Sequence, residues 1–202
     1  MTLHPFLAPI SRRLVLASQS PRRAEILRMH GLNFEIAPAH LDESPVHGEA
    51  FDHYVTRMAR DKALHAAAAY PTALCLGADT IVVQEGELLG KPADRSEACA
   101  ILERLQGRRH SVLSAVALAC QECDFLSAEA HRSEVRFRRL SQGEIERYVA
   151  TGEPMDKAGA YGIQGFGAML VEHLEGEYFN VMGLPVQGLR RLWAEFAARH
   201  GS

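Results

Sequence analysis

Apolar and polar positions follow two different periods along the chain. Apolar residues that alternate with polar ones, or that gather in short runs, predict strands over residues 14–17, 34–37, 73–76, 80–83, 111–119, 130–138 and 168–173. Apolar residues spaced by three and four predict helices over residues 21–30, 50–70, 96–106, 141–151 and 185–193. Because strands and helices alternate, the pattern favours an α/β fold.

Local signals indicate several element boundaries. Ser20-Pro21 is typical of an N-cap followed by proline at the first helical position, and Ser141 with Glu144 has the spacing of a capping box. The segment Gly77-Ala78-Asp79 is expected to interrupt the strands before and after it.

The composition limits the classes of protein to which the chain can belong. Its 202 residues, 47% hydrophobic and 23% charged, suit one globular domain or a compact pair of lobes. The net charge of -3 gives no overall attraction to nucleic acid or to an anionic membrane, so an anionic ligand requires a local cluster of cations. No segment reaches the roughly 20 apolar residues of a membrane span. The four cysteines lack the spacing of a zinc site, which indicates reduced thiols in a cytoplasmic protein.

The segment Ser18–Arg23 is the first candidate for such a cluster. It places Arg22 and Arg23 in the first turn of a helix, where the helix dipole disfavours cations. An anion held there by backbone N–H groups, by the hydroxyls of Ser18 and Ser20, and by the guanidinium groups would explain their presence. The alternative is a solvated helix start whose arginines pair with carboxylates such as Glu25.

Four further charged residues are candidates for phosphate chemistry. Lys62 continues the apolar stripe of its helix, so its ammonium requires a counter-charge unless the side chain reaches back to solvent. Asp79 follows an apolar run, so it is expected at the carboxyl edge of a sheet, where α/β proteins commonly bind their ligands. The alternative is a simple turn, in which aspartate is also common. Lys91, in the loop Gly90–Pro92, is a second phosphate contact or a surface lysine. Glu43 lies in an acidic loop that could hold a divalent ion or be merely solvated.

Taken together and in order, these segments resemble the Maf family of nucleoside triphosphate pyrophosphatases. The resemblance is carried by SQSPRRAEIL, the Glu43 loop, RDKA, GADTIV, GKP, DKAGAYGIQG and GEYFNVMGLPV, and it extends from Arg13 to Trp193. It implies an α/β fold with an elongated, mixed and twisted sheet surrounded by helices around a central cleft, similar to inosine triphosphate pyrophosphatases. It divides the chain into an N-terminal extension, residues 1–12, and one domain of two lobes, residues 13–202.

The resemblance also implies an activity. Members of the family hydrolyse a nucleoside triphosphate to the monophosphate and pyrophosphate with a divalent metal, Mg²⁺ or Mn²⁺, in the house-cleaning of non-standard nucleotides. Arg22, Thr80 and Gln164 resemble the branch that prefers dTTP and UTP, whereas the branch acting on 7-methyl-GTP has tryptophan, glutamine and glutamate at these places. A homodimer is expected, with no membrane or nucleic-acid partner.

The family and the residues together give each candidate a role. Asp79, Lys62 and Lys91 are expected to be catalytic, with Asp79 accepting a proton from the attacking water. Glu43 and Asp79 are expected to hold the metal. The remaining residues are expected to bind substrate: Ser18, Ser20, Arg22, Arg23, Thr80 and Gln164. The amide of Gln164 offers a donor and an acceptor to a uracil or thymine edge, or it satisfies backbone groups in its glycine-rich loop.

Two alternative functions remain open at this point. One is the same reaction on another modified nucleotide, such as 7-methyl-GTP. The other is a nucleic-acid-binding regulator of cell division that uses a basic stripe of Arg132, Arg136, Arg138 and Arg139. An exposed strand face with charged residues explains the same stripe, and no aromatic residues suited to base stacking are interleaved with it.

Overall fold

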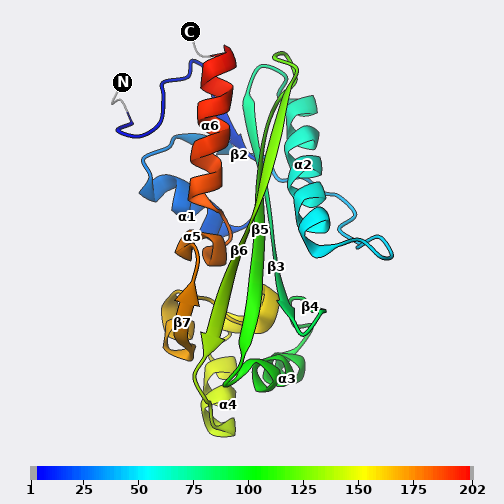
Figure 1. Ribbon diagram of the computed structural model, residues 1–202, viewed down its shortest axis with the longest axis vertical. Helices are drawn as coiled ribbons and strands as arrows, with labels where there is room; N and C mark the ends of the chain where they lie inside the picture. Colours follow the sequence, from blue (N-terminus) through cyan, green and yellow to red (C-terminus); the bar gives the residue numbers. More distant parts are fainter. Residues whose placement is uncertain (1–3, 201–202) are drawn as a thin grey trace. The chain divides into compact units, whose positions relative to one another are not determined.

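The structure, a computed structural model, describes residues 4–200. Within them, seven strands form one mixed sheet in the order β2-β1-β3-β5-β6-β7, and β4 pairs with β3 (Figure 1). The strands are β1 (Leu14–Leu16), β2 (Phe34–Ile36), β3 (Leu74–Gln84), β4 (Glu87–Leu89), β5 (Arg109–Cys120), β6 (Phe125–Phe137) and β7 (Val171–Glu175). β1 is parallel to β2 and β3, whereas β4 and β7 are antiparallel to their neighbours. The predicted α/β class and mixed sheet are confirmed.

Six α-helices and three short 3₁₀ helices occur among the described residues. The α-helices are α1 (Pro21–Met29), α2 (Phe51–Ala69), α3 (Arg95–Leu105), α4 (Gln142–Ala150), α5 (Tyr178–Met182) and α6 (Val186–His200). The 3₁₀ helices are η1 (Glu153–Asp156), η2 (Ala158–Ala160) and η3 (Gly165–Leu170). No helix in this described part combines the length and the apolar character needed to cross a membrane.

The chain divides into two compact units. The first contains the residues up to Asp79, Ser114–His131, and those from Gly183 onward. The second contains Thr80–Leu113 and Arg132–Met182. Each unit is described by itself below.

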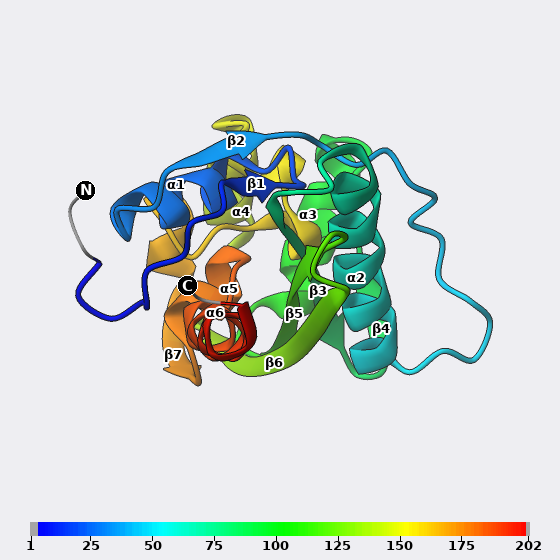
Figure 2. The ribbon, with the colours of Figure 1, turned by 90° about the horizontal axis from the view of Figure 1, so that it is seen from above.

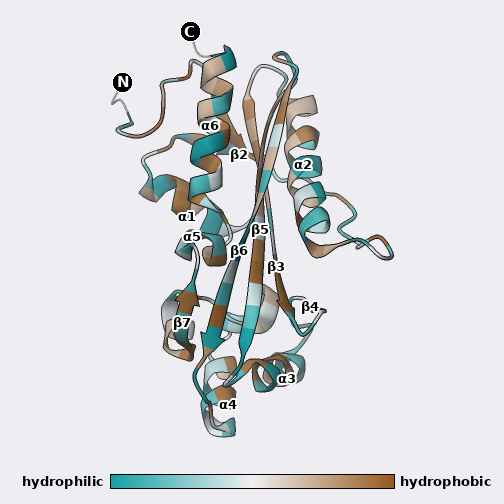
Figure 3. Cartoon of the chain, in the orientation of Figure 1, coloured by the Kyte–Doolittle hydropathy of each residue, from teal (hydrophilic) through white to brown (hydrophobic). Residues whose placement is uncertain are grey.

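In the first unit, helices cover both faces of the strands. Figures 1 and 2 show α2 on one side of β3 and β5, and α6 on the other. Buried side chains recur along α6 at the helical spacing, at Leu189, Leu192, Trp193 and Phe196. Figure 3 shows the matching alternation of hydrophobic and hydrophilic residues along this helix. α6 ends at His200 and so continues past the predicted end at residue 193. The added part contains Phe196, which is fully buried.

Gly77 lies inside β3, so the predicted interruption of the strand at Gly77-Ala78-Asp79 is wrong. A Cβ atom at Gly77 would lie 2.1 Å from the carbonyl oxygen of Ala59 and 2.6 Å from the backbone nitrogen of Ala63, both on α2. The glycine therefore permits close packing of helix backbone on strand rather than a turn. This close approach brings α2 against the part of β3 that carries Asp79.

The second unit is built around α3, α4 and the strand segments beside them. α3 packs against α4, and Leu102, Leu105, Val135, Phe137 and Tyr148 are among the buried residues of its core. The predicted capping box forms, since the backbone N–H of Ser141 donates to Glu144 and both halves of the motif are present.

Several predicted boundaries are wrong. Residues 165–170 form η3, so β7 begins only at Val171, and α5 was not predicted. Ser20 occupies the N-cap of α1 but makes no side-chain capping hydrogen bond. All four cysteines are free, in agreement with the predicted reduced thiols.

Candidate functional site

Three of the predicted charged residues meet in the first unit. The ammonium Nζ of Lys62 lies 2.7 Å from Oδ1 of Asp79 and 2.6 Å from Oε1 of Glu43. Lys62 and Asp79 are 6% and 8% exposed, whereas the side chain of Glu43 is about half exposed. The lysine thus meets its counter-charges inside the protein, and the alternative that it reaches back to solvent is wrong. We call these three residues the ion cluster.

The ion cluster follows from the packing of α2 on β3. The buried stripe of α2 contains Tyr54, Val55, Met58 and Ala59 before it reaches Lys62. Asp79 comes two residues after Gly77, where the backbone of the helix approaches the strand closely. A stripe position on the helix and a strand position beside the glycine therefore face one another.

Tyr54, on the buried face of α2, is a residue of this site that was not among the predicted candidates. Its hydroxyl donates a hydrogen bond of 2.7 Å to the backbone carbonyl of Glu43. Burial, together with the negative charges of Asp79 and Glu43, raises the pKa of Tyr54 to about 12. The phenol therefore stays protonated and holds the Glu43 loop. A tyrosine on a buried helical face was the available signal, because its hydroxyl requires a partner.

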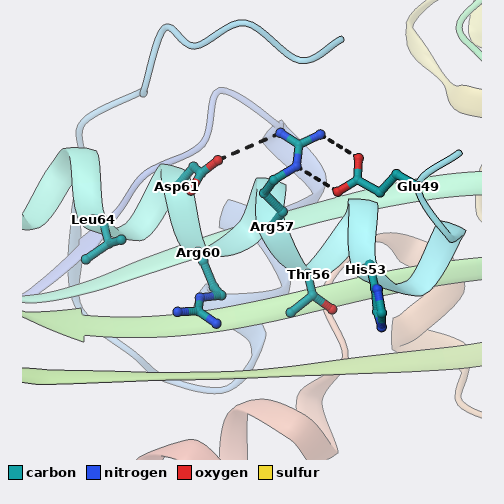
Figure 4. Close-up of a pocket in the computed structure, with 7 residues that line it drawn as sticks. All are labelled: Glu49, His53, Thr56, Arg57, Arg60, Asp61 and Leu64. Carbon is teal, nitrogen blue, oxygen red and sulfur yellow. Dashed lines mark hydrogen bonds and ion pairs between the residues drawn. The ribbon is translucent and has the colours of Figure 1, made fainter. Parts of the chain in front are cut away.

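Arg57 fastens the same loop at a second point. Its guanidinium binds both oxygens of Glu49, at 2.8 and 2.7 Å, and donates to the carbonyl of Ser44. Figure 4 shows this pair in a hollow on α2, where Asp61 also approaches Arg57. The hollow is lined by Glu49, His53, Thr56, Arg57, Arg60, Asp61 and Leu64. The ion-cluster residues are not among those lining it.

The start of α1 brings Ser18 and Arg23 together. The buried guanidinium of Arg23 donates to the hydroxyl of Ser18 and to the carbonyl of Gly183, both at 2.9 Å. Burial lowers the pKa of Arg23, while the charges of Asp79 and Glu43 raise it. Arg23 thus contacts Ser18 and Gly183, and the carboxylates of the ion cluster act on it electrostatically.

The other two predicted residues at this helix start are more accessible. Arg22 and Ser20 are half-buried, whereas Arg23 beside them is buried. The backbone N–H of Ser20 donates to the hydroxyl of Ser18, at 3.2 Å. Ser18 therefore organises the turn before α1, and the side chains of Arg22 and Ser20 lie nearer the surface.

Thr80, Lys91 and Gln164 belong to the second unit. Thr80 directly follows Asp79 on β3 and is half-buried, as is Gln164, whereas Lys91 is exposed. The loop of Lys91 is fixed to the glycine-rich segment, because the backbone N–H of Gly159 donates to the carbonyl of Gly90, at 3.0 Å.

A buried histidine, His110, contacts Tyr161 of the glycine-rich segment. His110 is 3% exposed, its Nε2 lies 2.9 Å from the hydroxyl of Tyr161, and its ring packs edge-on against Phe137 and Tyr161. Burial lowers the pKa of His110 to about 4. The imidazole is therefore neutral at pH 7 and supports Tyr161 as an uncharged partner.

This buried imidazole predicts a loss of stability in weak acid. The unfolded chain takes up a proton near pH 6.5, whereas the folded chain resists it down to about pH 4. The contribution is complete above pH 6.5 and is lost as the pH falls towards 4, by roughly 3 kcal/mol of unfolding free energy. The variant His110→Gln keeps an amide nitrogen near Tyr161 but cannot titrate. Urea unfolding at pH 7.5 and 4.5 should show a smaller loss for this variant, and an equal loss would contradict the prediction.

Two carboxylates of the ion cluster, those of Asp79 and Glu43, are candidate ligands for a divalent metal. Mg²⁺ commonly takes one or two protein carboxylates and fills its remaining positions with water and substrate phosphates. Asp79 and Glu43 offer carboxylates that converge on one nitrogen. No group of three or more His, Cys, Asp or Glu side chains in residues 4–200 forms a self-sufficient metal site. The residues therefore fit a metal that arrives with a phosphorylated substrate.

Two arginines of the basic stripe, which begins on β6 and continues past its end, are engaged in ion pairs. Arg136 pairs with Glu172 at 3.2 Å, and Arg138 pairs with Glu144 at 2.8 Å. Arg138 also donates to the carbonyl of Met169. These pairs weaken the nucleic-acid alternative, because a phosphate backbone would have to displace the carboxylates.

Proteins of known name are similar to this chain over most of its length. The dTTP/UTP pyrophosphatase of Symbiobacterium thermophilum is 49% identical over 185 residues, which cover 92% of this chain and 94% of that protein. The dTTP/UTP pyrophosphatase of Myxococcus xanthus is 50% identical, over 86% of this chain and 87% of its own.

Among solved structures, the Ham1 protein of Staphylococcus aureus has a similar fold. The TM-score is 0.50 and the identity is 13%, over 93% of this chain and 99% of that chain. A sequence model of Maf-like proteins matches residues 13–196. With relatives this similar over nearly its whole length, the chain belongs to the Maf-like protein family.

Proposed function

We propose that this protein hydrolyses dTTP and UTP to the nucleoside monophosphate and pyrophosphate. The observation that carries the proposal is the ion cluster, a buried lysine between two carboxylates, in a Maf-like chain. Relatives 43–50% identical over most of the chain bear the name dTTP/UTP pyrophosphatase. Such a cluster provides a base and a cation for phosphate chemistry.

In the proposed reaction, water attacks the α-phosphorus of the substrate. A bond forms between the water oxygen and this phosphorus, the bond to the bridging oxygen of the β-phosphate breaks, and pyrophosphate leaves. Asp79 orients the water and accepts its proton. Lys62, hydrogen-bonded to Asp79, holds that carboxylate in place and stabilises negative charge as it develops.

Cations neutralise the triphosphate in this protein of net charge -3. We assign this role to Arg22 and Lys91, and to the Arg23–Ser18 pair that shapes the turn before α1. Ser20 contributes its hydroxyl at the same helix start. Mg²⁺ or Mn²⁺, held by Glu43 and Asp79, would supply Lewis-acid neutralisation of the phosphate oxygens.

Recognition of the base is assigned to Gln164, Thr80 and Arg22. The amide of Gln164 can donate to and accept from the edge of uracil or thymine. At N3 and at position 4, cytosine reverses both of these hydrogen bonds, so a Gln164 amide held in one orientation selects against CTP. We further propose that the protein is a cytoplasmic homodimer. The division into an N-terminal extension, residues 1–12, and a two-lobed domain, residues 13–202, stays a prediction.

A nucleotide panel tests the proposed function. The purified chain should release pyrophosphate from UTP and dTTP in Mg²⁺ or Mn²⁺ faster than from CTP, ATP or 7-methyl-GTP. Removal of the metal with EDTA should abolish the release, and adding Mg²⁺ back should restore it. A preference for 7-methyl-GTP would show that the chain catalyses the same reaction on that nucleotide instead. DNA binding without any hydrolysis would refute the proposed enzymatic activity.

A further inference from the structure

We propose that Glu153 is a positioning residue for nucleotide selectivity, because its carboxylate fixes the backbone of the loop that carries Gln164. The inference rests on the proposed function, in which Gln164 contacts the base. Glu153 opens η1, directly after α4, and lies in the second unit together with the loop Gly162–Gly167. We call this segment the glutamine loop.

The carboxylate of Glu153 accepts three hydrogen bonds. The backbone N–H of Phe166 donates to Oε2 at 3.0 Å, and that of Gly167 donates to Oε1 at 2.9 Å. The hydroxyl of Tyr148 donates to Oε1, also at 2.9 Å. Charge-assisted bonds to two successive backbone N–H groups are stronger than neutral ones and fix the direction of the peptide planes.

The opposite end of the glutamine loop is held by Tyr148. The backbone N–H of Gly162 donates to the hydroxyl of Tyr148, at 3.2 Å. Tyr148 therefore accepts from one end of the loop while it donates to Glu153, which accepts from the other end. Gln164 lies between the two attachments, half-buried and with an extended backbone at φ −101°.

The glycines of the loop allow this close contact. A Cβ atom at Gly165, where φ is +64°, would lie 2.5 Å from Oε2 of Glu153. A Cβ atom at Gly167 would lie 2.2 Å from the carbonyl oxygen of Gly162 and 2.6 Å from the hydroxyl of Tyr148. Glycine is thus required at both positions because the loop closes tightly over these polar atoms.

Glu153 is itself anchored on the α4 side. Its backbone N–H donates to the hydroxyl of Thr151, at 3.1 Å, and the ammonium of Lys157 donates to its carbonyl. Tyr148 lies on α4 and belongs to the core of the unit, and Thr151 is the C-cap of the same helix. The position of the carboxylate is therefore set by the core, and the glutamine loop takes its shape from the carboxylate.

The test compares Glu153→Gln with Gln164→Ala. Glutamine keeps the size of the side chain but replaces one acceptor oxygen by an NH₂ donor, which opposes a donor at Phe166, Gly167 or Tyr148. We expect the ratio of kcat/KM for UTP to that for CTP to fall about tenfold in both variants. Amide hydrogen exchange at Phe166 and Gly167 should accelerate in Glu153→Gln and stay unchanged in the control Glu146→Gln, on the exposed face of α4.

The possible results separate this inference from the proposed function. An unchanged UTP/CTP ratio in Gln164→Ala would refute the base-recognition role itself. A lowered ratio in Gln164→Ala, with an unchanged ratio in Glu153→Gln, would refute the positioning role of Glu153 alone. An equal loss of activity towards UTP and CTP in Glu153→Gln would also refute it. If Glu153→Gln does not fold, Tyr148→Phe removes one donor to the carboxylate and should give a smaller fall in the same ratio.

Discussion

Replacing Asp79 by asparagine is expected to lower kcat for UTP at least ~10²-fold, the usual cost of losing a general base. Asparagine has nearly the same size, and its carbonyl oxygen can still accept the hydrogen bond from Lys62 that spans 2.7 Å in the native protein. The change therefore removes one charge and one proton acceptor while it preserves the packing of α2 on β3. Substrate binding should weaken little, because the change removes a negative charge that repels the triphosphate.

Steady-state release of pyrophosphate from UTP, measured over a range of Mg²⁺ concentrations, is the corresponding experiment. If the carboxylate is the base, the rate of Asp79→Asn should stay low at every Mg²⁺ concentration. If Asp79 acts mainly as a metal ligand, higher Mg²⁺ should restore part of the rate. The control Asp52→Asn, an exposed aspartate in the first turn of α2, should keep native activity. Near-native turnover by Asp79→Asn would remove this carboxylate from the chemistry.

The strand that carries Asp79 shows where prediction from sequence succeeded and where it failed. The apolar residues before and after Gly77 correctly indicated strand, but the glycine was interpreted as a break. Its reason is the backbone of α2, in particular the carbonyl of Ala59 only 2.1 Å from where a Cβ atom would lie. Such a contact is between segments distant in sequence, so local turn preferences cannot identify it.

The ion cluster could be predicted in part. Lys62 broke an otherwise apolar stripe, and this break correctly indicated a buried ammonium with a counter-charge. Which carboxylates supply that charge depends on the register of α2 against β3 and on the path of the Glu43 loop. Tyr54 and Glu153 were not predicted as site residues. Each forms a hydrogen bond with the backbone of a segment distant in sequence, and no residue spacing in the sequence indicates such a contact.

Helix geometry was easier to predict than the 3₁₀ segments. The helical stripe of α2 and the capping box of α4 depend on residues three or four apart, which the sequence displays directly. η3 depends instead on the carboxylate of Glu153, which accepts from two of its backbone N–H groups, and on the positive φ angle of Gly165. The glycine-rich stretch was therefore expected to be a loop and not a 3₁₀ helix.

Replacing Lys62 by methionine should reduce kcat about 10²-fold or more and should also destabilise the fold. Methionine fills similar volume, so packing on the stripe of α2 is largely kept. The loss leaves the buried carboxylate of Asp79 without the ammonium 2.7 Å away, and removing one partner of a buried pair costs on the order of 3 kcal/mol. Turnover falls because the ammonium no longer positions Asp79 or stabilises charge on the phosphates.

A double variant separates the two effects of Lys62. Adding Asp79→Asn to Lys62→Met removes the uncompensated carboxylate, so thermal unfolding should return towards the native midpoint while pyrophosphate release stays as low as in the single variants. The control Arg60→Met, an exposed position on the same helix, should leave both quantities unchanged. If Lys62→Met unfolded like the native protein and turned over UTP at the native rate, the ammonium would be a passive neighbour of the two carboxylates. Stability recovered together with activity in the double variant would likewise show that the charges serve the fold and not the reaction.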